Sequence, residues 1–224
     1  MEELEEKLGY RFRDRALLRT ALTHSSYANE HRCASNERLE FVGDSVLGMV
    51  TAAYLYQHYP ELPEGKMTRL RAEIVCEQSL WDVAETLRLG QKLLLGRGED
   101  SSGGRTRPSI LADAVEAVIA AVYLDGGFEP ARNVIDRYIL SKLEGDATAL
   151  VRDWKTELQE IIQRKPGKTL SYEMTGESGP DHMKRFVSAV SCNGTVIGSG
   201  EGRSKKEAEQ MAARAAMLAM QEND

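Results

Sequence analysis

The chain has 224 residues, of which 42% are hydrophobic, so it can form one sizeable core and a small second domain, and disorder over most of its length is excluded. A formal net charge of -6 argues against a generic nucleic-acid binder, although basic residues gather in Arg97–Arg107 and Lys184–Lys206. No apolar run is long enough to span a bilayer, so no membrane partner is expected.

Residues 1 to about 143 show helical periodicity throughout. Apolar residues recur at helical intervals in the segments Ala16–Leu22, Leu39–Tyr56, Met67–Val75, Ser79–Leu87, Ile110–Tyr123 and Ala131–Leu143. The proline-containing turn Tyr59–Gly65, Gly90 and the Gly/Ser-rich stretch Gly96–Ser109 separate them, and we predict a mobile loop for the last. Pro108 and Ser109 are start signals for the helix that follows.

Three acids stand at helical spacing in the segment Asn36–Gly48, which has the sequence NERLEFVGDSVLG. Glu37, Glu40 and Asp44 occupy positions i, i+3 and i+7, so their carboxylates share a narrow arc of an otherwise largely apolar helix. This arrangement is repulsive unless a cation is present, and hard cations such as Mg²⁺ take carboxylate oxygens. A helix with an acidic solvent face is the alternative interpretation.

Two further acids interrupt the segment Ser109–Leu124, which is otherwise apolar on every side. Such a helix is buried, and acids are almost never fully buried unless they are paired or bind a cation. Two buried ion pairs would explain Asp113 and Glu116, which stand at i and i+3. We favour a second explanation, in which two helices face each other and pool their acids into one metal-binding cluster of Glu40, Asp44, Asp113 and Glu116.

The pattern weakens around residues 144–150, where we place a domain boundary, with the first domain at 1–148 and the second at 153–222. The second domain is predicted to contain a helix, three strands and a closing helix, in the segments Asp153–Gln163, Leu170–Thr175, Arg185–Cys192, Thr195–Gly198 and Ser204–Gln221. Asn193-Gly194 is a strong hairpin signal. The predicted fold is an all-α domain followed by a small α+β domain of order α-β-β-β-α, with both helices on one face of the sheet.

These motifs closely resemble those of ribonuclease III. The segment NERLEFVGDSVLG is similar to the hallmark motif of that family, and the flanking segments LGYRFRDRALLRTALTHSSY and SILADAVEAVIAAVYLDGG match the same family. The second domain resembles a double-stranded-RNA-binding domain, with GPDH in a loop and SKKEAEQMAA on its last helix. The resemblance covers nearly the whole chain and implies a nuclease domain followed by one RNA-binding domain.

The resemblance implies a Mg²⁺-dependent endonuclease that hydrolyses double-stranded RNA, leaving 5′-phosphate and 3′-hydroxyl ends, and that processes ribosomal and messenger RNA precursors. Mn²⁺ is expected to substitute for Mg²⁺. Glu40, Asp44, Asp113 and Glu116 are the expected metal ligands, and Glu37 and Glu64 fall at positions of a second acidic cluster near the cleavage site. The expected catalytic residues are Asp44, Glu116, Glu37 and Glu64. Two cations about 4 Å apart can activate water and neutralise the leaving 3′-oxygen without a protein nucleophile, so we expect a structural role for His24.

Double-stranded RNA is recognised mainly by shape, across its minor groove. Three surfaces of the second domain suit that task, and their predicted contacts are Thr156, Gln159, Glu160 and Gln163 on one helix, Pro180, Asp181 and His182 in a loop, and Ser204, Lys205 and Lys206 at the start of the last helix. Ser204 is predicted to cap that helix, and the two lysines to contact phosphate. Glu209 stands where many such domains carry a basic residue, which predicts modest RNA affinity.

The resemblance further implies a homodimer in which two acidic clusters face one valley, and the apolar residues Phe41 and Val42 could form its interface.

The odd set Cys33, Cys76 and Cys192 shares no ligand spacing, so we expect reduced thiols in a cytoplasmic protein. The acidic N-terminus does not resemble a secretory signal.

One alternative function is that of an RNA-binding regulator without catalysis, but no catalytic acid is missing. Another is a di-metal redox protein, which would carry paired Glu-x-x-His motifs that this chain lacks. No small-molecule cofactor is expected.

Overall fold

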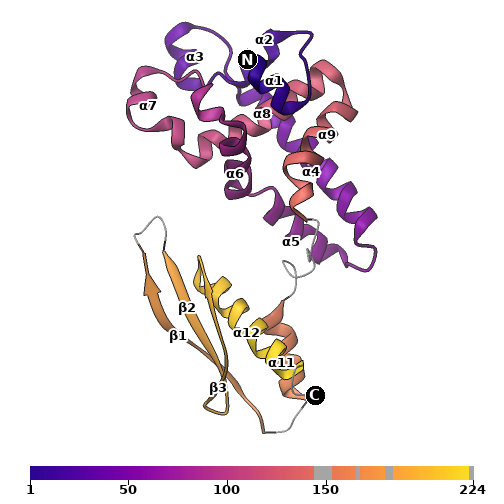
Figure 1. Ribbon diagram of the computed structural model, residues 1–224, viewed down its shortest axis with the longest axis vertical. Helices are drawn as coiled ribbons and strands as arrows, with labels where there is room; N and C mark the ends of the chain where they lie inside the picture. Colours follow the sequence, from indigo (N-terminus) through magenta and orange to yellow (C-terminus); the bar gives the residue numbers. More distant parts are fainter. Residues whose placement is uncertain (144–152, 165–166, 180–183, 222–224) are drawn as a thin grey trace. The chain divides into compact units, whose positions relative to one another are not determined.

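A computed structural model describes residues 1–143, 153–164, 167–179 and 184–221 of the chain. The chain divides by its internal contacts into two compact units, Met1–Val151 and Arg152–Asp224 (Figure 1). The predicted domain boundary around residues 144–150 lies outside the described residues, as do Pro180, Asp181 and His182.

The described part of the first unit is helical, apart from one isolated β-bridge between Thr23 and Leu94. Its elements are α1 (Glu2–Leu8), α2 (Arg15–Ala21), α3 (Ser25–His31), α4 (Glu37–His58), α5 (Glu64–Ile74), α6 (Glu77–Leu87), η1 (Leu89–Gln91), α7 (Arg97–Ser101), η2 (Gly104–Thr106), α8 (Pro108–Gly126), α9 (Phe128–Tyr138) and η3 (Leu140–Leu143), where η marks a 3₁₀ helix. The six predicted helices are present, and the last of them ends as the 3₁₀ turn η3. In the described residues no helix has both the length and the apolar character needed to cross a membrane.

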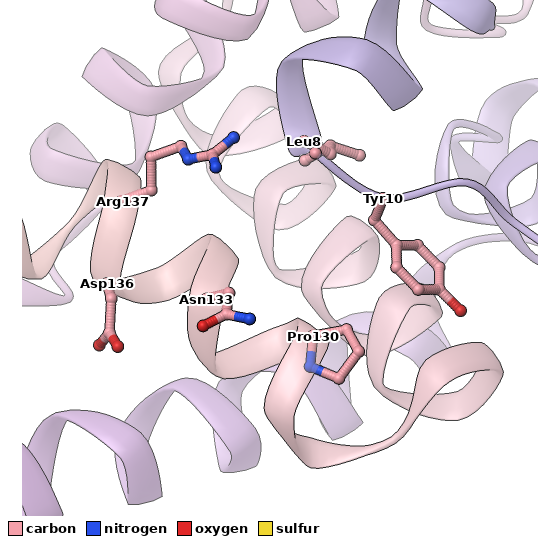
Figure 2. Close-up of a pocket in the computed structure, with 7 residues that line it drawn as sticks. Leu8, Tyr10, Pro130, Asn133, Asp136 and Arg137 are labelled. Atoms are coloured by element: carbon pink, nitrogen blue, oxygen red, sulfur yellow. The ribbon is translucent and has the colours of Figure 1, made fainter.

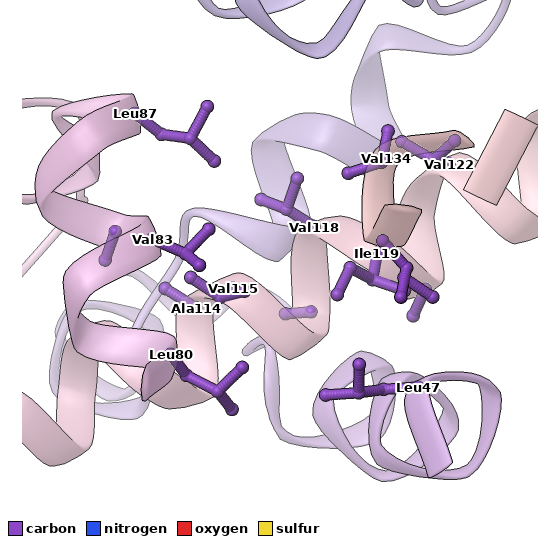
Figure 3. Packing of buried hydrophobic residues seen from close by; sticks show 14 of the residues in the cluster. Leu47, Leu80, Val83, Leu87, Ala114, Val115, Val118, Ile119, Val122 and Val134 are labelled. Atoms are coloured by element: carbon purple, nitrogen blue, oxygen red, sulfur yellow. The ribbon is translucent and has the colours of Figure 1, made fainter. Parts of the chain in front are cut away.

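Helix α8 is the centre of the first unit. It packs against α2, α4, α6 and α9, and its residues from Ile110 to Val122 are buried except for Asp113 and Glu116. Figure 3 shows Leu80 and Val83 of α6 directed toward α8. Burying each Val, Leu or Ile side chain contributes about 1.5–3 kcal/mol. The predicted buried helix is therefore confirmed, but its two acids are half-buried rather than enclosed.

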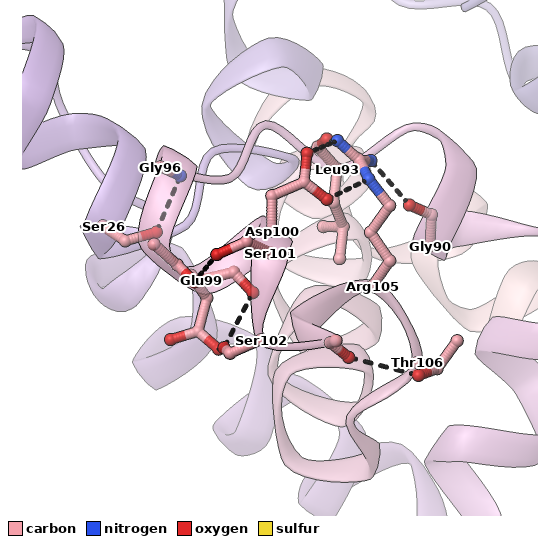
Figure 4. Close-up of polar contacts among 12 residues, drawn as sticks. Ser26, Gly90, Leu93, Gly96, Glu99, Asp100, Ser101, Ser102, Arg105 and Thr106 are labelled. Carbon is pink, nitrogen blue, oxygen red and sulfur yellow. Dashed lines mark hydrogen bonds and ion pairs between the residues drawn. The ribbon is translucent and has the colours of Figure 1, made fainter.

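The stretch Gly96–Ser109, predicted to be a mobile loop, contains the short helix α7 and the turn η2. Arg105 holds this stretch in place, because its guanidinium makes two hydrogen bonds to Asp100, at 2.7 and 2.9 Å, and donates to the carbonyls of Gly90 and Leu93 at 3.0 Å (Figure 4). The prediction was wrong because glycine and serine content indicates loop but does not show the long-range contacts of an arginine. Pro108 occupies the first turn of α8, as predicted.

The second unit has the predicted order of one helix, three strands and one helix. Its elements are α11 (Trp154–Gln163), β1 (Leu170–Ser178), β2 (Arg185–Cys192), β3 (Thr195–Gly202) and α12 (Lys205–Gln221). The sheet is antiparallel with order β1-β2-β3, and Asn193 and Gly194 form the predicted two-residue hairpin, with φ values of 50° and 84°. Both helices lie on one face of the sheet (Figure 1). Two strands extend beyond their predicted ends: β1 ends at Ser178, three residues after the predicted Thr175, and β3 ends at Gly202, four residues after the predicted Gly198.

Small residues allow α12 to lie close against β3. A Cβ atom added to Gly198 would lie 2.4 Å from the backbone oxygen of Ala212, and one added to Gly200 would lie 2.3 Å from the nitrogen of the same residue. The strand glycines at every second position therefore face helix alanines at close range. Next to this contact the core of the unit is built from Trp154, Leu158, Ile162, Val190, Ala213, Ala216 and Met217.

Candidate functional site

The candidate metal centre lies where α4 and α8 come closest together. A Cβ atom at Gly43 would lie 2.0 Å from the backbone oxygen of Glu116 and 2.4 Å from its carbonyl carbon, so only glycine permits this approach. Gly43 precedes Asp44 and follows Glu40 by three residues, so both acids lie beside the contact. This role of Gly43 was not predicted, because a single sequence shows a glycine but not the helix that packs against it.

Three of the four predicted metal ligands converge in the structure. One carboxylate oxygen from each of Glu40, Asp113 and Glu116 lies within 4.8 Å of the others, and all three residues are half-buried. Asp44 is exposed and does not belong to this group of three, yet among charged groups it has the largest effect on the pKa of Glu116. The structure therefore places Asp44 beside the cluster, at its solvent side.

The three clustered carboxyls all have raised pKa values. Burial is the largest cause of the rise in the pKa of Glu116 to about 7, and the charges of Asp44, Glu40 and Asp113 add to it. Burial also raises the pKa of Glu40, followed by the charges of Asp113, Glu37 and Asp44. Each carboxylate therefore destabilises its neighbours when it is ionised.

No ion pair offsets this repulsion within the described part of the chain. None of the ion pairs described there includes Glu40, Asp44, Asp113 or Glu116, which removes the explanation by two buried ion pairs. Converging carboxylate oxygens with unfavourable mutual charge are a donor set that suits a hard divalent cation such as Mg²⁺ or Mn²⁺. The residues present therefore fit the expected metal.

His24 and Glu77 border the cluster. Burial raises the pKa of Asp113, the charge of His24 lowers it, and the charge of Glu77 raises it. His24 is the N-cap of α3, where its Nδ1 accepts a hydrogen bond from the backbone nitrogen of Ser26 at 3.2 Å. This contact agrees with the predicted structural role of His24. Glu77, in the first turn of α6, was missed because the sequence does not show that α6 packs against α8.

The two remaining predicted acids have different positions. Glu37 is exposed at the start of α4, accepts a hydrogen bond from Ser35 at 2.7 Å, and raises the pKa of Glu40. Glu64 is exposed at the start of α5 and accepts a hydrogen bond from Thr68 at 2.9 Å. Glu37 is thus among the charges that shift the pKa of a clustered carboxyl, whereas Glu64 is not.

Two of the three predicted RNA-binding surfaces fall within the described residues. The side chains of Thr156, Gln159, Glu160 and Gln163 are exposed on α11, opposite its buried face of Trp154, Leu158 and Ile162. Ser204 caps α12 as predicted, because its Oγ accepts a hydrogen bond from the nitrogen of Glu207 at 3.2 Å. Lys205 and Lys206 are exposed in the first turn of α12. Pro180, Asp181 and His182 lie outside the described residues.

A cavity of about 450 Å³ lies in the first unit between the end of α1 and helix α9. Figure 2 shows Tyr10 and Arg137 on opposite sides of it, and Asn133 and Asp136 also line it. None of the predicted site residues is among its lining, so it is separate from the acidic cluster.

Comparison with known proteins identifies relatives along nearly the whole chain. The family model described as Ribonuclease-III-like matches residues 14–143, and the model described as Double-stranded RNA binding motif matches residues 154–220. The chain is 53% identical over 215 residues to Ribonuclease 3 of Symbiobacterium thermophilum, covering 95% of this chain and 91% of that protein. It is 48% identical over 219 residues to Ribonuclease 3 of Listeria monocytogenes, covering 96% of each. A solved nuclease domain of ribonuclease III from Campylobacter jejuni matches with a TM-score of 0.60 and 43% identity, covering 62% of this chain and 96% of that one.

Proposed function

The chain belongs to the ribonuclease III family of double-stranded-RNA endonucleases, and on this premise we propose which metal, residues and products its reaction uses. The proposed cofactor is Mg²⁺, with Mn²⁺ as a substitute, and the proposed products carry 5′-phosphate and 3′-hydroxyl ends. The proposed substrates are ribosomal and messenger RNA precursors in the cytoplasm. This choice of substrates rests on the family alone.

The observation that carries this proposal is the convergence of Glu40, Asp113 and Glu116, whose carboxylate oxygens lie within 4.8 Å of one another. We assign metal binding to these three and to Asp44. Bound divalent cations would supply neutralisation of the phosphate charge and a lowered pKa for the attacking water. The four acids determine where the positive charge of the cations is held. Asp44, at the exposed side of the cluster, lies where a phosphodiester can approach.

The acids Glu37 and Glu64 are proposed to act beyond the metal ligands. Glu37 is exposed and close enough to Glu40 to affect its pKa, so it can orient a water or a ribose hydroxyl beside the cluster. Glu64 stands in the first turn of α5 and is not one of the three clustered carboxylates. Its proposed contribution to cleavage therefore depends on the RNA or on a second protomer that brings the reacting strand to it.

The proposed assembly is a homodimer. Phe41 is 76% exposed on α4, immediately after Glu40, although a phenylalanine side chain contributes most when it is buried. Val42 is half-buried beside it. The matched Campylobacter jejuni structure is described as having a flexible region involved in dimer formation of its nuclease domain. A two-fold contact through Phe41 would set two acidic clusters near one another, as cleavage of both strands of a duplex requires.

Incubation of the purified protein with an end-labelled RNA duplex tests this function. Cleavage is expected with Mg²⁺ and with Mn²⁺, and none is expected in a chelator or with a single strand of the same sequence. Products should be ligatable at their 5′-phosphates without prior treatment. Binding of the duplex without cleavage under every metal condition would instead indicate an RNA-binding regulator.

A further inference from the structure

An internal ion pair joins the two helices that carry the proposed RNA contacts. The Nζ atom of Lys155, in the first turn of α11, lies 2.6 Å from Oε2 of Glu209 on α12. The same ammonium lies 4.5 Å from the ring centroid of Tyr172, on strand β1. The two side chains of the pair are 34% and 27% exposed, so solvent and ligands can reach them.

The position of this pair relates it to the proposed phosphate contacts. Glu209 follows Lys205 by four residues and Lys206 by three, so the three side chains share one face of α12. On α11, Lys155 directly precedes Thr156 and stands four residues before Gln159, both of which are exposed. The pair therefore lies between the proposed minor-groove helix and the proposed phosphate-binding lysines.

The surroundings of the pair are rich in negative charge. Asp153 accepts hydrogen bonds from the nitrogen of Thr156 at 3.2 Å and from Nε2 of Gln210 at 2.9 Å. Burial raises the pKa of Tyr172 to about 12, and the charges of Glu209 and Asp153 contribute to that rise. Lys155 is thus already neutralised within the protein, and a phosphate that approaches it also meets the carboxylate of Glu209.

From this geometry we infer that Glu209 restrains duplex binding, because it holds Lys155 in an internal ion pair and adds a negative charge beside Lys205 and Lys206. Lys155 is then able to bind phosphate, but in the free protein it is paired with Glu209 instead. This inference rests on the proposed RNA-binding surface of the second domain. It also gives a physical account of why the affinity expected for a domain with glutamate at this position is modest.

Replacing the glutamate by its neutral isostere is the direct test. The Glu209→Gln variant of the full chain should bind a labelled RNA duplex about threefold to tenfold more tightly at 0.1 M salt, the scale of one added phosphate contact. Its log affinity should fall more steeply with log salt, by about one unit of slope. Binding is measured in a chelator so that no cleavage occurs. A pair that solvent reaches as this one does contributes little to folding, so the melting temperature should stay close to the parental value.

Three variants accompany it. Lys155→Gln leaves Glu209 unpaired and should weaken binding, whereas the double variant K155Q/E209Q should bind like the parent. Glu173→Gln is the matched control, because it removes the same charge from the exposed face of β1, opposite to the side on which Tyr172 packs. It should change neither affinity nor salt slope appreciably.

The outcomes separate this inference from the function on which it rests. A Glu209→Gln variant that binds no more tightly than the parent overturns the restraint, and so does one that binds more weakly with a lowered melting temperature, which would make the pair structural. The double variant Lys205→Ala, Lys206→Ala should weaken binding of every duplex sequence and flatten the salt slope. If that variant instead binds like the parent, the proposed phosphate-binding surface itself is wrong.

Discussion

Among single residues, Glu116 has the least favourable surroundings in the cluster. Burial and, after it, the charges of three other acids raise its pKa to about 7, and its own backbone carbonyl is the group that Gly43 approaches. Near neutral pH the metal-free protein therefore either retains a proton on this carboxyl or accommodates an uncompensated charge. A divalent cation removes that conflict, which is the physical reason for assigning Glu116 to the metal.

This assignment predicts how stability depends on pH in a chelator. The pKa of the Glu116 carboxyl rises from an ordinary value of 4.5 to about 7 in the folded protein, so the folded state holds the proton more tightly. Its contribution to the free energy of unfolding is therefore greatest below pH 4.5 and is lost as the pH rises to about 7. Denaturant unfolding of the parent and of Glu116→Gln, compared from pH 5 to pH 8, should show a fall in the parent that is smaller in the variant. Parallel curves would contradict the proposed surroundings of this carboxyl.

At the scale of elements, the acidic cluster depends on the close contact between α4 and α8 and not only on the formation of the two helices. Apolar periodicity predicted α4 and α8 and the arcs on which their acids lie, and the Asn193-Gly194 signal predicted the hairpin. The sequence does not show distances between helices, so the tight approach at Gly43 and the neighbourhood of Glu77 were missed. For the same reason the acids of α8 were predicted to be buried, although both are only half-buried.

Two short polar helices were also not predicted from the sequence. Helix α3 has the sequence SSYANEH and α1 the sequence EELEEKL, and neither was predicted, because seven residues give too few apolar positions to establish a period. Both helices make hydrogen bonds to residues outside themselves. The carboxylate of Glu5 in α1, for example, accepts hydrogen bonds from the nitrogen of Phe12 and from Arg15, each at 2.9 Å.

The contact between α4 and α8 predicts the effect of one added methyl group. Gly43→Ala places a Cβ where the backbone of Glu116 lies, so the helices must separate, at a cost of about 1–3 kcal/mol. Thermal melting should show this loss, and cleavage should fall with it because the acids no longer converge. Gly98→Ala is the control, since a Cβ at that helical position meets no atom within 4 Å. A Gly43→Ala variant with parental stability would show that the two helices do not depend on this contact.

At the scale of the whole molecule, the two units have separate hydrophobic cores. The core of the first unit extends from Leu4 to Leu143, and that of the second from Trp154 to Met217. In a chain with two such cores each unit can have its own function, with duplex binding mainly in the second unit and cleavage in the first.

Cutting the chain near residue 150 tests this division. Residues 153–224 should fold alone and bind duplex RNA, while residues 1–150 should remain dimeric and cleave weakly at low salt, where electrostatic attraction to the duplex is strongest. Sedimentation, duplex binding and cleavage of the two fragments provide the readouts. A fragment 1–150 that is monomeric under all conditions would count against two acidic clusters acting in one valley.

The most direct measurement compares duplex cleavage and duplex binding by the parent and by Glu116→Gln in the same Mg²⁺ titration. The variant keeps the size of the side chain, so binding and folding should persist, with thermal stability in a chelator no lower than that of the parent. Cleavage should fall by about a hundredfold or more, because the lost charge stabilisation is worth several kcal/mol and about 1.4 kcal/mol corresponds to each tenfold change. Glu85→Gln, an exposed position on α6, should cleave normally. A Glu116→Gln variant that cuts like the parent, or that unfolds as the partner of a broken ion pair would, contradicts the assignment of the metal centre.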